Sequence, residues 1–74
     1  MKEICTVSIG TGILDNDYTF YDDGRIKRFY DRNMQRYNIE AWVSVGDIST
    51  SDKSKILQKC SDEDREYLTS VLIG

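Results

Sequence analysis

The sequence predicts an α+β domain in which a small antiparallel sheet of three or four strands is followed by two short C-terminal helices. Strand-like alternation is confined to the first 45 residues, an Asp-Gly turn lies between two aromatic runs, and helical spacing begins only after residue 50. Strands first and helices after are typical of the α+β class. Because 74 residues leave room for one core, we expect a single domain over residues 1–74, with the sheet over about 3–45 and helices over about 51–60 and 62–72.

The first strand is predicted from Ile4 to Ile9, where apolar and polar residues nearly alternate. This period places Cys5, Val7 and Ile9 on one face, which we expect to point inward. Gly10-Thr11-Gly12 then ends the strand.

A β-hairpin is predicted over residues 18–30. Two runs rich in aromatic and β-branched residues are separated by Asp22-Asp23-Gly24, and glycine supplies the positive φ that a tight hairpin needs. If the loop has three residues with Gly24 left-handed, Phe20 lies opposite Ile26 and Tyr18 lies opposite Arg28. A slip of one residue would turn every side chain to the other face.

Residues 39–45 alternate between apolar and polar or aromatic side chains, which predicts a strand. The alternative is a short helix from Met34 to Trp42, because Met, Gln, Arg, Glu and Ala favour helix.

Two helices are predicted in the last third of the chain. Ser51 is the expected cap of a helix that ends at Cys60, with Ile56 and Leu57 on its apolar face. Ser61 is the expected cap of the second, whose first turn is acidic, as the helix dipole favours. The predicted core is Val7, Ile9, Phe20, Ile26, Val43, Ile48, Ile56, Leu57, Leu68, Val71 and Leu72.

Composition argues against catalysis. The chain has no His, the commonest general base and metal ligand. Gly10-Thr11-Gly12 lacks the third glycine of a nucleotide-binding turn, and Asp15-Asn16-Asp17 lacks the glycine and glutamate of a calcium loop. We therefore expect no catalytic residue, no metal site and no cofactor.

The compartment is predicted from the N-terminus and the cysteines. No signal-peptide pattern opens the chain and no apolar run is long enough to cross a bilayer, so a cytoplasmic protein without a membrane partner is expected. Cys5 and Cys60 fit no zinc spacing and should be reduced thiols that act as small buried apolar residues. A disulfide between them is the alternative.

Charge is unevenly distributed along the chain. Residues 1–24 hold one basic and five acidic side chains, residues 25–37 hold five basic and one acidic, and residues 38–74 hold four basic and seven acidic. The overall charge of −3 thus conceals a segment with a charge of +4. Seven of the eight aromatic residues lie between Tyr18 and Trp42, and Arg and aromatic side chains dominate interface hot spots.

This basic and aromatic segment predicts a small non-enzymatic protein-interaction module, an inhibitor or adaptor, that docks a protein partner. The alternative is a nucleic-acid-binding protein that uses residues 25–37, although nucleic-acid-binding domains are usually basic overall. A third interpretation is that the basic residues pair within the chain. A homodimer through a free sheet edge is also expected. The predicted partner-binding residues are Arg25, Arg28, Tyr30, Arg32, Arg36, Tyr37 and Trp42.

Overall fold

A computed structural model describes residues 2–10, 14–31, 35 and 38–73 of the chain. Four strands come first: β1 (Glu3–Ser8), β2 (Asn16–Tyr21), β3 (Ile26–Tyr30) and β4 (Ile39–Val43). A 3-10 turn, η1 (Val45–Asp47), leads to the helices α1 (Thr50–Lys59) and α2 (Asp62–Leu72). The α+β class and the order of strands before helices are confirmed, and the sheet has four strands.

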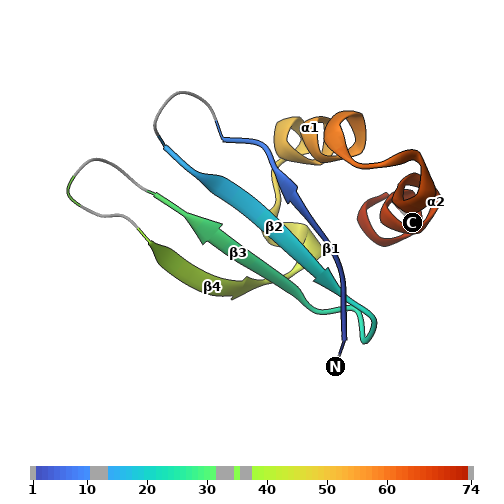
Figure 1. The fold of residues 1–74 in the computed structure, drawn as a ribbon, viewed down its shortest axis with the longest axis horizontal. Coiled ribbons are helices and arrows are strands. Elements are labelled where there is room, and N and C mark those ends of the chain that lie inside the picture. Colours follow the sequence, from blue (N-terminus) through green and yellow to red (C-terminus); the bar gives the residue numbers. More distant parts are fainter. Residues whose placement is uncertain (1, 11–13, 32–34, 36–37, 74) are drawn as a thin grey trace.

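The sheet is an antiparallel meander in the order β1-β2-β3-β4, so each strand pairs with its neighbour in sequence. Figure 1 shows the strands side by side, with α1 and α2 gathered near β1 and away from β4. This arrangement leaves β1 and β4 as the two edges of the sheet.

The hairpin between β2 and β3 has the predicted register. The Tyr21 N–H donates to the Arg25 carbonyl at 3.0 Å, and the Gly24 N–H donates to the Tyr21 carbonyl at 3.1 Å. Gly24 has a φ of +88°, the left-handed conformation that this loop requires. Phe20 accordingly pairs with Ile26, and Tyr18 pairs with Arg28.

The last strand settles the choice between strand and helix for residues 39–42, because Ile39–Val43 pairs with β3 throughout. The predicted strand is therefore confirmed for these residues and the alternative helix is wrong for them, while the expected start of that helix at Met34 lies outside the described part of the chain. The strand also ends earlier than residue 45. The Asp47 carboxylate accepts the Ser44 N–H at 3.0 Å and the Ser44 hydroxyl at 2.9 Å, which turns the chain into η1.

The helix caps differ in part from the prediction. Ser49, and not Ser51, caps α1, since the Ser49 hydroxyl accepts the Asp52 N–H at 3.1 Å. Ser49, Thr50 and Ser51 are all residue types that can cap a helix, and Ser49, which lies three positions before Asp52, is the one that caps α1. Ser61 occupies the cap of α2 as predicted, but its hydroxyl donates to the Asp64 carboxylate at 2.8 Å.

The core lies between the helices and one face of the sheet. Most of the predicted residues are buried, but Val43, Leu57 and Val71 are only partly so. Tyr18 is buried although it was not predicted, with 2% of its surface exposed. The buried core residues are Val7, Ile9, Tyr18, Phe20, Ile26, Ile48, Ile56, Cys60, Leu68 and Leu72.

Gly10, after β1, has a steric role, which the comparison of Gly10-Thr11-Gly12 with a nucleotide-binding turn did not predict. A Cβ atom at this position would clash with the Leu14 carbonyl oxygen and would lie 2.8 Å from the Asn16 nitrogen. The backbone entering β2 thus passes where a side chain would be, so only glycine fits without movement of that backbone.

Candidate protein-interaction surface

Strand alternation divides the predicted partner-binding residues between the two faces of the sheet. Side chains of paired residues share a face, and successive side chains alternate between faces. Ile26 belongs to the core, so its face is here called the inner face and the opposite one the outer face. Arg28 and Tyr30 therefore lie on the inner face, whereas Trp42, which pairs with Lys27, lies on the outer face. The single docking surface predicted from sequence is corrected to two separate groups.

The first group lies on the outer face and is called the aromatic patch; it consists of Tyr21, Arg25, Lys27 and Trp42. The Tyr21 and Trp42 ring centroids are 5.4 Å apart and tilted by 53°. The Lys27 Nζ lies 5.2 Å from the centre of the Trp42 ring, and the Arg25 guanidinium carbon lies 5.9 Å from it. Trp42 keeps 51% of its surface exposed despite these contacts. A large aromatic side chain is thus held in place by its neighbours while its surface stays accessible.

Carboxylates balance the cations of the aromatic patch. Asp23 lies 3.3 Å from the Arg25 Nε, and Glu40 lies 4.0 Å from the Lys27 Nζ. Both pairs are at least partly exposed to solvent, so each contributes little stability. Their effect on the surface is larger, because they offset the positive charges of Arg25 and Lys27 beside Trp42.

The second group lies on the inner face around Arg28. The Arg28 guanidinium carbon lies 4.1 Å from the centre of the Tyr30 ring and 5.6 Å from that of Tyr18. Its Nε donates to the Asn16 side-chain oxygen at 2.8 Å. Arg28 and Tyr30 are therefore brought together, but Arg28 is engaged within the fold by Asn16 and the two tyrosine rings.

Arg32, Arg36 and Tyr37 lie outside the described residues. Of the seven predicted partner-binding residues, the structure thus places two in the aromatic patch, Arg25 and Trp42. Tyr21 and Lys27 complete it and were not predicted as site residues. The register between β3 and β4 sets Lys27 opposite Trp42, and the hairpin loop sets Tyr21 beside Arg25.

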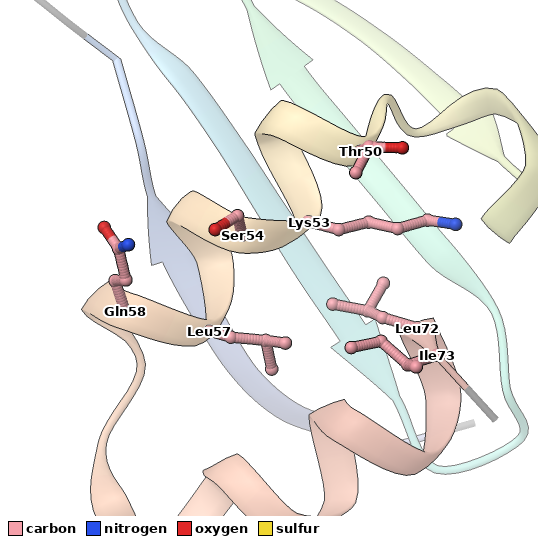
Figure 2. A pocket seen from close by; sticks show the side chains of 7 residues that line it. All are labelled: Thr50, Lys53, Ser54, Leu57, Gln58, Leu72 and Ile73. Carbon is pink, nitrogen blue, oxygen red and sulfur yellow. The ribbon is translucent and has the colours of Figure 1, made fainter.

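A second concave surface lies where α1 meets the end of α2 and was not predicted from sequence. It has a volume of about 550 Å³. Figure 2 shows Leu57, Leu72 and Ile73 turned toward one another, with Lys53 extended beside them. Its lining residues are Thr50, Lys53, Ser54, Leu57, Gln58, Leu72 and Ile73.

Two side chains have shifted pKa values that make them less reactive near neutral pH. Burial, together with the nearby Asp64 carboxylate, raises the pKa of the Cys5 thiol to about 11. Burial and the hydrogen bond to Asp52 raise the pKa of Tyr18 to about 12. Cys5 and Cys60 are both free of disulfide bonds, and the described residues contain no cluster of three or more acidic or cysteine side chains that could hold a metal ion.

Comparisons with protein families, with curated proteins and with solved structures found no match for this chain. None of the helices in the described residues has the length and the apolar character that crossing a bilayer requires. The aromatic patch is thus the feature of the molecule from which a function is inferred.

Proposed function

We propose that this chain is a small non-enzymatic interaction module that docks a protein partner through the aromatic patch in the cytoplasm. The observation that carries the proposal is Trp42, which is half exposed yet fixed between Tyr21, Arg25 and Lys27. Trp, Tyr and Arg are the residues most enriched in interface hot spots. A side chain that is already ordered also loses little conformational entropy when a partner covers it. Such a patch suits an inhibitor or an adaptor equally.

The charge balance favours a protein partner over nucleic acid. Nucleic-acid binding draws most of its affinity from cations that contact phosphates. Here Asp23 and Glu40 accompany the cations next to Trp42, and a phosphate chain would have to approach these carboxylates as well. A protein surface can provide both an apolar cavity for Trp42 and polar groups for its charged rim.

The proposal is tested by site-specific capture. A photoreactive amino acid at Lys27 is used to crosslink the partner in cells of the source organism, and the partner is then purified and its affinity measured. Trp42→Ala should weaken that affinity by about 30-fold or more, the effect of losing a hot spot worth about 2 kcal/mol. Ser8→Ala is the matched control, because Ser8 is exposed on the outer face but belongs to β1.

Equal affinity of the Trp42→Ala variant and the native protein would contradict the assignment of the patch. Fluorescence anisotropy with single- and double-stranded oligonucleotides at low salt tests the nucleic-acid alternative. Binding that weakens steeply with salt and is lost in Lys27→Glu would replace our proposal with that alternative.

A further inference from the structure

The free edge of β4 has a definite set of unpaired backbone groups. Antiparallel strands alternate between hydrogen-bonded and non-bonded residue pairs. The bonds from Tyr21 to Arg25 and from Asp31 to Asp15 mark the odd-numbered residues around β3 as those that bond to β2. The even-numbered residues of β3 therefore bond to β4, through Ile39, Ala41 and Val43. Glu40 and Trp42 consequently direct their N–H and carbonyl groups away from the sheet.

Both ends of this edge are closed by side chains of the same chain. Asn38, just before β4, donates its N–H to the Asp31 carboxylate at 2.9 Å. Ser44, just after β4, donates its N–H to the Asp47 carboxylate at 3.0 Å. The open part of the edge is therefore the short segment between them, centred on Ala41.

The two edges of the sheet differ in how well they resist pairing with another strand. In β1 the register shifts between Glu3 and Cys5, and α1 packs against this strand. Bulges and covering helices are common ways of protecting an edge. By contrast, β4 keeps a regular register over its whole length and contains no Pro and no Lys. It is thus the edge that is open to another strand.

We propose that a second copy of this chain pairs with β4, antiparallel and about a two-fold axis at Ala41. In this arrangement the N–H of Glu40 donates to the carbonyl of the partner's Trp42, and the carbonyl of Glu40 accepts the N–H of the partner's Trp42. The two-fold axis repeats this pair of hydrogen bonds on its other side. Ala41 faces the partner's Ala41 as a non-bonded pair. The interface is isologous, so one patch of each protomer contacts the same patch of the other.

The sequence of β4 is complementary to itself in this register. On the inner face, Ile39 lies opposite the partner's Val43, which continues the apolar row across the interface. On the outer face, Glu40 lies opposite the partner's Trp42. A hollow of about 180 Å³, lined by Lys27, Glu40, Ala41 and Trp42, is present along this edge. It can receive the partner's Glu40, whose carboxylate would then approach the Lys27 ammonium group.

The pairing would produce one continuous sheet of eight strands with two aromatic patches on the same face. It uses the backbone edge of β4 and does not rest on the proposed function, since Trp42 side chains stay on the outer face. A different protein that adds its own strand to β4 is the other occupant such an edge could take, and the experiments below distinguish the two.

The first experiment measures the molecular mass by sedimentation equilibrium from micromolar to near-millimolar concentration. We expect the native chain to dimerise and Glu40→Pro to remain monomeric, because proline removes an N–H that points to the edge and is not used by β3. Glu40→Gln keeps that N–H and should still dimerise. Circular dichroism verifies that each variant is folded. A native chain that stays monomeric at every concentration would overturn the proposal and would leave β4 as an edge for the strand of a different protein. A folded Glu40→Pro variant that dimerises as the native chain does would also overturn it.

The second experiment tests the register without relying on proline. Ala41→Cys places two thiols across the axis with Cα atoms about 4.5 Å apart, within the range that a disulfide spans. Mild oxidation with diamide should therefore link this variant into a covalent dimer. Ile39→Cys is the matched control. It lies on the same face of β4, but it stands opposite the partner's Val43, four positions along the strand from the partner's Ile39. Equal crosslinking of the two variants would overturn the register.

Discussion

At the scale of single residues, Tyr18 shows how a polar side chain becomes part of the core. Its ring is almost fully buried, and its hydroxyl donates to the Asp52 carboxylate at 2.9 Å. The hairpin pattern predicts the neighbours of Tyr18 within the sheet, namely Phe20 and Arg28. It cannot predict Asp52, which lies 34 residues later in the first turn of α1, because that contact depends on how the helix packs. The tertiary fold thus supplies the Asp52 carboxylate, the hydrogen-bond acceptor that offsets the cost of burying the Tyr18 hydroxyl.

Replacing Tyr18 with Phe should lower the free energy of unfolding by about 1 kcal/mol, the usual contribution of one hydrogen bond. The ring stays in place, and only the bond to Asp52 is lost. Urea denaturation followed by circular dichroism measures the change. In a double-mutant cycle with Asp52→Ala, which removes the acceptor, the effects of the two substitutions should not add, because both remove the same contact. Additive effects, or an unchanged midpoint, would contradict this role.

At the scale of elements, Asp31 joins three parts of the sheet. One oxygen of its carboxylate accepts the Asp15 N–H at 3.0 Å and the other accepts the Asn38 N–H at 2.9 Å. These bonds fix the chain before β2 and before β4, where Asn38 adopts a positive φ of 56°. Residues 31–38 have no clear period, so the sequence alone does not reveal this connection.

Stability toward acid should depend on Asp31. The two backbone N–H groups that it accepts lower its pKa from the ordinary value of 3.8. The folded state therefore favours the ionised form, so this contribution is complete above pH 4 and is lost as the pH falls below 3.8 through the folded pKa. Asp31→Asn should lower the urea midpoint at pH 7 and weaken its decrease between pH 4 and pH 2. Asp47 behaves in the same way for a similar reason, so some decrease should remain. An acid profile identical to that of the native chain would exclude a role for Asp31.

The elements that the sequence predicted well are those with local causes. The hairpin register follows from Gly24 and the length of its loop, and the start of α2 follows from Ser61 and the acidic residues after it. The identity of residues 39–42 as a strand depended on pairing with β3, which local propensity does not contain. The cap of α1 depended on which of three similar residues stands three positions before Asp52.

At the scale of the whole molecule, the structure differs more from the predicted binding surface than from the predicted fold. Charge and aromatic content are counted along the chain, whereas a surface is defined across strands. The predicted hairpin register already sets Arg28 on the face of Ile26, so a surface containing both Arg28 and Trp42 conflicts with the alternation of a strand. The helices pack on the inner face, so the same alternation that turns Arg28 toward that face leaves Trp42 half exposed on the other.

The whole fold should also lose stability in alkali. The folded state raises the pKa of Cys5 from 9.0 to about 11 and that of Tyr18 from 10.0 to about 12, mainly through burial. The unfolded chain therefore releases both protons at lower pH than the folded chain. Their contribution to stability is complete below pH 9 and is lost progressively as the pH rises toward 12. Urea midpoints measured from pH 7 to pH 11 should fall above pH 9.

The two residues can be separated by substitution. Cys5→Ala should reduce the fall of the urea midpoint that begins near pH 9, and Tyr18→Phe should reduce the part that begins near pH 10. Each variant lacks one of the two groups whose pKa differs between the folded and unfolded chains. The double variant should show the flattest profile, although it starts from a lower stability at pH 7. If the double variant lost stability as steeply as the native chain, other groups would control the alkaline transition. A flatter profile would show that the fold holds these two groups, one on β1 and one on β2, in their neutral forms.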